Sequence, residues 1–366
     1  MLTEQPPETR VSLTPDGAAT LKKNNLEVLI EHGAGQKAAF PDQLYQQAGA
    51  QLASRAEILN NADILLTINL PSDADIVAAG GNKIWIGVFQ PLFNPDVIKA
   101  WAPRAMAIFS LDALPRTTRA QAMDVLSSQA NIAGYKAVLL AANVFPRYFP
   151  MFMTAAGSIP PAKVLILGAG VAGLQAIATA RRLGAVVEVF DTRPAVKEEV
   201  MSLGAKFVEV EGAADASKAG GYAVEQSTEF LAKQKAKIAE HAAKADIIIT
   251  TAQIPGKKAP ILITKEMVAG MKPGAVIIDI AAATGGNTEF TRNNETVVVH
   301  DVTIIGNSYL PSSMPSDASK MYSKNVQNFL KLIIDKEGAL QLNFEDDLVK
   351  GCCMAHQGGV VYDRIQ

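Results

Sequence analysis

The chain has 366 residues and a formal net charge of −2, with 49% hydrophobic and 19% charged residues. These values are typical of a globular protein of two domains with an ample core. A surface without a basic excess argues against non-specific binding to nucleic acid. No apolar run approaches the roughly 18 residues of a membrane-spanning helix, and residues 1–7 lack the basic segment and apolar core of a secretory signal.

Cysteine and histidine usage argues against two further kinds of site. The only cysteines, Cys352 and Cys353, are adjacent, so we expect no disulfide framework and a cytoplasmic protein. The four histidines have no metal-ligand spacing, and we predict no metal site.

In chain order, short apolar runs first alternate with helical pieces, as is typical of an α/β fold with a parallel sheet. A mostly helical, alanine-rich stretch is predicted to follow over residues 131–153. The strands predicted before it lie at 26–31, 64–68, 83–89 and 106–110, with a helix at 42–48.

The most informative segment begins with an apolar run at 164–167, typical of a buried strand. Gly168, Gly170 and Gly173 follow at the spacing of a dinucleotide-binding turn. The first glycine permits the tight turn, the second lets the backbone approach a pyrophosphate, and the third lets the helix lie against the strand. The helix N-terminus then offers free N–H groups and a positive dipole end to the phosphates.

An acidic residue closes the second strand of this unit. Asp191 stands at about the 20-residue spacing at which a carboxylate accepts hydrogen bonds from the adenosine ribose. A 2′-phosphate would meet that carboxylate, which favours NAD(H) over NADP(H). Arg193 leaves the choice open, because a nearby arginine can accommodate the phosphate.

The remaining chain predicts further strands at 207–210, 246–250, 275–280 and 303–305, and a helix at 317–334. Residues 211–230 are rich in Gly, Ala, Ser and Lys, and we interpret them as a long surface loop, either a lid or an insertion without a role. The final tail is too short for a domain of its own and is expected to return to the first domain.

We therefore predict an α/β fold of two Rossmann-like, doubly wound parallel-sheet domains separated by a cleft. The N-terminal domain is expected to be discontinuous, formed by residues 1–130 and 320–366. The dinucleotide-binding domain is expected to span residues 131–319.

A polar segment at the predicted domain junction carries a second candidate site. It contains Arg116, Gln121, Asp124 and Ser127. From spacing alone, it is either a capped helix start with a solvated polar face or part of a nicotinamide site in an interdomain cleft.

Taken together, these motifs resemble the NAD(H)-binding component, the first domain of the alpha subunit, of proton-translocating NAD(P) transhydrogenases. The resemblance covers essentially the whole chain. Its matching segments are 10–15, 116–135, 153–157, 160–164, 168–178, 191–194, 220–222, 250–257 and 285–287.

The resemblance implies that Arg116, Gln121, Asp124 and Ser127 orient the nicotinamide and its ribose for direct hydride transfer. It implies a mobile loop over residues 211–230, with Tyr222 at its tip. Gln253 stands where relatives often carry leucine, so a role for its side chain is left open. The complete set of residues expected to bind NAD(H) is Arg116, Thr117, Thr118, Arg119, Gln121, Gly168, Gly170, Val171, Gly173, Asp191, Thr192, Arg193, Gly221, Tyr222 and Gln253.

Partners follow from the same resemblance. NADP(H) is expected on a separate component, with a membrane-spanning component that conducts protons. The chain itself is expected to be a homodimer, peripheral on the cytoplasmic face of the inner membrane.

Alanine dehydrogenases share this fold and are the competing interpretation. That family places Lys, His and Asp in the segments that here read 68–71, 88–91 and 283–286, and none of the three is present. Only Arg10 could persist as a carboxylate anchor, and one arginine cannot perform the acid–base chemistry of amine oxidation. A non-catalytic NAD(H)-binding module is a third possibility, although it would not need the junction segment.

Overall fold

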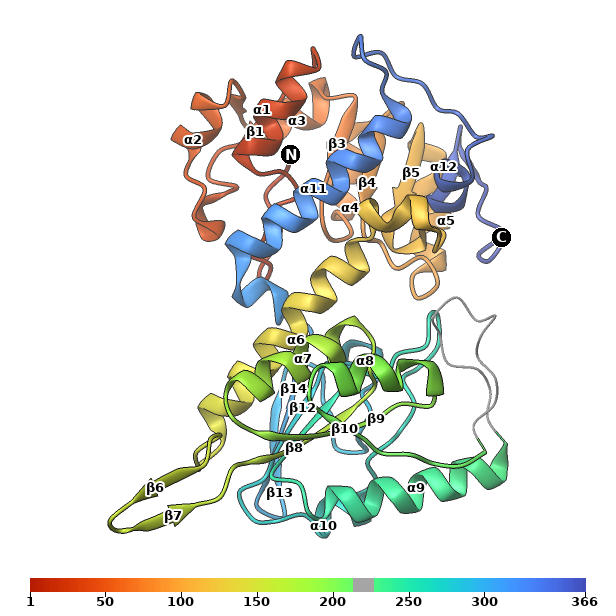
Figure 1. The fold of residues 1–366 in the computed structure, drawn as a ribbon. Helices are drawn as coiled ribbons and strands as arrows, with labels where there is room; N and C mark the ends of the chain where they lie inside the picture. Colours follow the sequence, from red (N-terminus) through yellow and green to blue (C-terminus); the bar gives the residue numbers. More distant parts are fainter. Residues whose placement is uncertain (213–226) are drawn as a thin grey trace. The chain divides into compact units, whose positions relative to one another are not determined.

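The computed structural model describes residues 1–212 and 227–366 (Figure 1). The chain divides into two compact units, the first formed by residues 1–129 and 311–366 and the second by residues 130–310. Among the described residues, no helix combines the length and apolar character needed to cross a membrane.

The second unit contains a seven-stranded sheet in the order β10-β9-β8-β11-β12-β14-β13. All neighbouring strands pair in parallel except β13 with β14, at one edge. The chain winds outward from β8 in both directions, so the carboxyl end of β8 is the switch point at which such sheets bind ligands. The strands are β8 (Lys163–Leu167), β9 (Val186–Phe190), β10 (Lys206–Phe207), β11 (Ile247–Thr250), β12 (Val276–Asp279), β13 (Thr296–Val299) and β14 (Val302–Gly306).

Helices cover both faces of this sheet, as Figure 1 shows. Alternation along β8 sends Val164 and Ile166 to one face and Leu165 and Leu167 to the other. The first face packs on α6 (Val125–Val144), α7 (Val171–Arg182) and α8 (Lys197–Ser202). The second packs on α9 (Thr228–Ala242) and α10 (Lys265–Ala269).

The first unit contains a five-stranded sheet in the order β16-β15-β5-β4-β3. Strands β3 (Ile64–Leu66), β4 (Ile84–Gly87) and β5 (Ala107–Ser110) are parallel. Strands β15 (Cys353–His356) and β16 (Gly359–Val360) come from the C-terminal segment and continue the sheet in antiparallel fashion. A separate parallel pair joins β1 (Leu29–Glu31) to β2 (Gln51–Ala53).

Helices again lie on both faces. One face packs on α1 (Pro15–Lys23), α2 (Asp42–Gln47) and α11 (Pro315–Ile333). The other packs on α3 (Arg55–Asn61), α4 (Asp73–Ala79) and α5 (Pro95–Trp101). A last helix, α12 (Asp347–Cys352), precedes β15, and its two cysteines are buried thiols, not a disulfide.

The predicted fold class is confirmed, with one correction in the alanine-rich stretch. The helix predicted to reach residue 153 ends at Val144, and β6 (Phe152–Thr154) pairs with β7 (Gly157–Ile159) in a hairpin. Pro146 and Pro150 follow the helix closely, and proline lacks the N–H that a continuing helix needs. The predicted loop at 211–230 ends earlier than expected, since α9 begins at Thr228, and residues 213–226 lie outside the described part.

Candidate functional site

The glycine turn of the second unit joins β8 to α7 at the switch point of the sheet. Gly168 has φ +105°, a conformation that favours glycine, and Gly173 is equally constrained, because a Cβ there would lie 1.9 Å from the carbonyl oxygen of Gly168. A Cβ on Gly170 would meet no atom within 4 Å. No side chain caps α7 at Gly170, so the first N–H groups of the helix face this open space.

Asp191 follows β9 beside this turn. Its Oδ2 accepts hydrogen bonds from the backbone N of Ala169 at 2.7 Å and from Nη2 of Arg193 at 2.7 Å. Its Oδ1 accepts from the backbone N of Arg193 at 2.8 Å and from Nε of Arg193 at 2.9 Å. The carboxylate therefore ties the glycine turn to the arginine two residues further on.

The ends of the neighbouring strands support the turn from the other side. Thr251, directly after β11, donates from Oγ1 to the carbonyl of Gly168 at 3.2 Å. Asn287 is fully buried and holds the next residues: its Oδ1 accepts from N of Ala252 at 3.0 Å, and its Nδ2 donates to the carbonyls of Ala252 at 2.9 Å and Pro260 at 2.8 Å. Asp279, buried at the end of β12, accepts from N of Asn287 at 2.6 Å.

The polar segment of the first unit precedes and begins α6. Asp124 accepts hydrogen bonds at its two carboxylate oxygens from N and Oγ of Ser127, at 2.9 and 2.5 Å. This pair fixes the first turn of the helix, because the carboxylate satisfies a free N–H group. Arg116 and Gln121 are exposed.

Contacts from the C-terminal part of the chain hold this segment in place. Arg119, predicted to bind the cofactor, forms a bidentate ion pair with Asp346 at 2.8 and 2.5 Å and also contacts Asp347. Asn325 and Asn328 of α11 both donate to the carbonyl of Ala122, at 2.9 and 3.0 Å. The loop is therefore anchored by elements that lie some 200 residues away along the chain.

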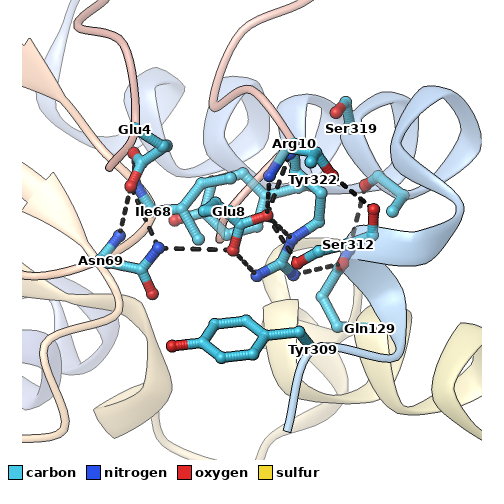
Figure 2. Close-up of polar contacts among 12 residues, drawn as sticks. Glu4, Glu8, Arg10, Ile68, Asn69, Gln129, Tyr309, Ser312, Ser319 and Tyr322 are labelled. Atoms are coloured by element: carbon cyan, nitrogen blue, oxygen red, sulfur yellow. Dashed lines mark hydrogen bonds and ion pairs between the residues drawn. The ribbon is translucent and has the colours of Figure 1, made fainter. Parts of the chain in front are cut away.

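A buried polar cluster lies near the N-terminus of the first unit (Figure 2). Arg10 donates from Nε and Nη2 to the two oxygens of Glu8, at 2.8 and 2.6 Å, and from Nη1 to Gln129 at 2.8 Å. Ser312 adds a hydrogen bond to Glu8 at 2.7 Å. The Arg10 guanidinium is thus neutralised and held by groups of the chain itself.

The two acidic residues of this cluster have opposite pKa shifts. Burial acts to raise the pKa of Glu8, but the hydrogen bonds and charge of Arg10 outweigh it and lower the pKa to about 2. Burial raises the pKa of Glu4, against the hydrogen bonds that it accepts from Ile68 and Asn69. Glu8 is therefore the charged partner of Arg10.

Comparison with known proteins accounts for both units. The chain matches the family model "alanine dehydrogenase/PNT, N-terminal domain" over residues 1–133 and "alanine dehydrogenase/PNT, C-terminal domain" over residues 137–363. The chain belongs to the alanine dehydrogenase/PNT family. The resemblance predicted from its motifs is thereby confirmed.

Within this alanine dehydrogenase/PNT family, the chain is more similar to transhydrogenase subunits than to alanine dehydrogenase. It is 44% identical to NAD(P) transhydrogenase subunit alpha of Haemophilus influenzae, covering 96% of this chain and 69% of that protein. It is also 44% identical to the first of the separate polypeptides that make up subunit alpha in Rhodospirillum rubrum, covering 99% and 96%. The crystal structure of transhydrogenase from Sinorhizobium meliloti superposes with a TM-score of 0.90 at 44% identity, covering 98% and 99%.

Alanine dehydrogenase is a more distant relative. The Mycobacterium tuberculosis enzyme is 29% identical over 98% of this chain. At the segments where the sequence predicted the loss of its acid–base residues, this chain has Asn69, Gln90 and Thr284.

The structure brings one group of the predicted residues together in the second unit: Gly168, Gly170, Val171, Gly173, Asp191, Thr192 and Arg193 all lie at the turn or directly after β9. Gln253 is exposed in the loop after β11. The other group, Arg116, Thr117, Thr118, Arg119, Gln121, Asp124 and Ser127, lies in or beside η4 (Thr118–Met123) of the first unit. Gly221 and Tyr222 lie outside the described residues.

Sequence reasoning gave no supporting role to Asn287 or Asp279. The available signal was a polar residue directly after each buried strand, which in parallel sheets gathers at the ligand-binding edge. In the part of the chain that the structure describes, no group of three or more His, Cys, Asp or Glu side chains could hold a metal ion.

Proposed function

We propose that this chain is the NAD(H)-binding component of a proton-translocating transhydrogenase. It holds NAD(H) so that hydride passes directly between this nicotinamide and that of NADP(H) bound on a partner component. Bound NAD(H) supplies the hydride chemistry, and the chain supplies binding, orientation and exclusion of water.

One observation carries the dinucleotide part of the proposal: the open space at Gly170 faces the uncapped N-terminus of a twelve-residue helix, with Asp191 beside it. The helix end offers N–H groups and a positive dipole to a pyrophosphate. The carboxylate is suited to the adenosine ribose and opposes a 2′-phosphate, which favours NAD(H).

The segment at Arg116–Ser127 supports the orienting role. Direct hydride transfer releases no proton to solvent, so the chain needs groups that position a ring and a ribose and does not need an acid or a base. Gln121 is exposed and polar, and the loop that carries it is anchored at Arg119 and Ala122. We assign Gln121 and Arg116 to contacts with the nucleotide, and Asp124 and Ser127 to fixing the start of α6.

The proposal disfavours amino-acid oxidation for a specific reason. Of the groups that this chemistry requires, only Arg10 remains, and its guanidinium is engaged by Glu8 and Gln129. Asn69 and Gln90 cannot transfer protons near neutral pH.

The test mixes the purified chain with an NADP(H)-binding transhydrogenase component and follows reduction of an NAD analogue. Gln121→Asn shortens the amide side chain by one methylene, and we expect turnover to fall by roughly tenfold or more with NADH binding largely kept. Gln46→Asn, at an exposed position of α2, is the matched control and is expected to leave turnover unchanged. Wild-type turnover that persists in Gln121→Asn would remove Gln121 from the mechanism.

A parallel assay supplies the isolated chain with alanine and NAD, and then with pyruvate, ammonia and NADH. We expect no turnover above background. Robust conversion in either direction would replace the transhydrogenase proposal by the alanine dehydrogenase one.

We also propose a homodimer that docks at the cytoplasmic face of the membrane through the partner components. The hairpin β6–β7 favours self-association, since residues 151–160 are all exposed and include Met151, Phe152, Met153 and Ile159. Apolar groups gathered on a projecting arm are typical of an interaction surface.

A further inference from the structure

The carboxylate of Asp191 has no acceptor position to spare. A carboxylate offers about four lone-pair positions on its two oxygens. Four donors occupy them here: the backbone N of Ala169, and N, Nε and Nη2 of Arg193, at 2.7 to 2.9 Å. A ribose diol that donates to Asp191 must therefore displace donors already present.

The two kinds of donor differ in their freedom to leave. The backbone N–H groups of Ala169 and Arg193 are fixed by the glycine turn and by the chain after β9. The guanidinium is attached through a flexible side chain of which 17% is exposed, whereas only 6% of the Asp191 side chain is exposed. Rotation of the Arg193 side chain would free one acceptor position on each carboxylate oxygen, which are the two positions that a 2′,3′-diol needs.

We propose that Arg193 is a specificity-determining residue, whose guanidinium occupies on Asp191 the positions of the adenosine ribose hydroxyls and is displaced when NAD(H) binds. This inference rests on the proposed function, in that it takes the glycine turn to be the NAD(H) site. It adds that the arginine competes with the preferred nucleotide.

The same pair determines the response to a 2′-phosphate. An arginine at this position can bind that phosphate in NADP-dependent proteins of this fold. Here the bidentate contact to Asp191 holds the guanidinium in an internal ion pair, and the carboxylate also repels the phosphate. Asp191 thus disfavours NADP(H) in two ways, by its charge and by retaining Arg193.

The experiment measures NADH and NADPH dissociation constants by nucleotide fluorescence, on the full chain and without any partner. Arg193→Met removes the side-chain donors and keeps the backbone N–H. We expect NADH to bind about threefold to tenfold more tightly, because no ion pair is lost on binding. Arg182→Met, at an exposed position of α7, is the matched control and should leave both constants unchanged.

The second arm uses Asp191→Asn, which removes the negative charge and weakens the hold on Arg193. We expect NADPH to bind at least about tenfold more tightly than to wild type, and the gain to disappear in the double variant Asp191→Asn with Arg193→Met. Thermal unfolding of each variant verifies that the second unit is folded.

The inference is overturned if Arg193→Met leaves NADH affinity unchanged or weakens it, if Asp191→Asn gains no affinity for NADPH, or if the gain persists in the double variant. The proposed function fails separately, in that case because wild type binds no NADH.

Discussion

At the scale of single residues, the Glu8–Arg10 pair makes acid stability of the first unit testable. The pKa of Glu8 lies at about 2 in the folded chain against an ordinary 4.5, so the folded state binds fewer protons than the unfolded state between these values. The stabilisation, on the order of 3 kcal/mol for such a shift, is fully present above pH 4.5 and is lost as pH falls toward 2.

We therefore predict that Glu8→Gln lowers the free energy of unfolding at pH 7 and flattens its decline between pH 4.5 and pH 2. Urea titrations followed by tryptophan fluorescence provide the measurement, since both tryptophans, Trp85 and Trp101, are buried in the first unit. Glu4→Gln is the contrast: the pKa of Glu4 is raised, so this variant should not lose stability at pH 7 in the same way. Parallel pH profiles for wild type and Glu8→Gln would contradict the assignment.

Residue identities at the glycine turn were predictable, but their pairing was not. Spacing and residue type located Gly168, Gly170 and Asp191, because backbone geometry restricts what can stand there. Whether Arg193 turns toward Asp191 or toward a ligand depends on its side-chain rotamer, which a sequence pattern does not contain. The same holds for Arg119, whose partner Asp346 is distant in the chain.

At the scale of the element, the turn before α7 predicts opposite outcomes for two glycines three residues apart. Gly170→Ala adds a methyl group to open space at φ −77°, so we expect an unchanged melting temperature and NADH binding weakened by about tenfold or more, because the methyl group would lie where the pyrophosphate approaches. Gly173→Ala places a Cβ against the Gly168 carbonyl and should lower the melting temperature. Calorimetry and NADH titration separate the two; full NADH affinity in Gly170→Ala would argue against a pyrophosphate at this turn.

The loop after β11 predicts a role for Asn287. In Asn287→Asp, a carboxylate oxygen would face the carbonyls of Ala252 and Pro260, to which Nδ2 now donates. Unfavourable contacts of this kind cost about 1–3 kcal/mol, and we expect the loop to shift and NADH affinity to fall by roughly tenfold. Asn293→Asp is the control, because Asn293 serves as an acceptor for Ser308 and aspartate keeps that acceptor. Equal NADH affinity in both variants would leave Asn287 without a positioning role.

Elements with a strong local signal were predicted well, and those defined by pairing were not. The buried strand at β8 and the parallel strands after it follow from apolar runs between turns. The edge strand β13 and the strands β6, β15 and β16 were missed, since short exposed or antiparallel strands carry little periodicity of their own. Asn287 was missed as a clamp because its partners lie 27 and 35 residues away.

At the scale of the whole chain, the two sheets have different amounts of sequence support. The α/β class followed from alternation alone, whereas the mixed sheet of the first unit depends on β15 pairing with β5, some 245 residues away along the chain. Burial of Cys352 and Cys353 follows from this pairing, and burial raises the pKa of Cys353 to about 12. Contacts of such range leave no local pattern by which to predict them.

The hairpin β6–β7 predicts how the chain associates with its own copy. Two three-residue strands with both faces exposed are not expected to be stable in water by themselves, and an apolar arm lowers its free energy by packing on another surface. The stretch from Tyr148 to Ala162 carries no charge, so two copies of it meet without electrostatic repulsion. A symmetric dimer is the commonest assembly that such a self-complementary surface forms.

We therefore expect wild type to have twice the chain mass of 38.8 kDa in light scattering, and the variant Phe152→Asp with Met153→Asp to be a monomer, since burying two carboxylates in an apolar interface is costly. Met201→Asp is the control: Met201 is equally exposed on α8 of the same unit, at 56%, and lies outside the hairpin. A dimer that persists in the hairpin variant would place the interface elsewhere. A wild-type monomer that recruits a second chain only when the NADP(H)-binding component is added would assign the apolar arm to that partner instead.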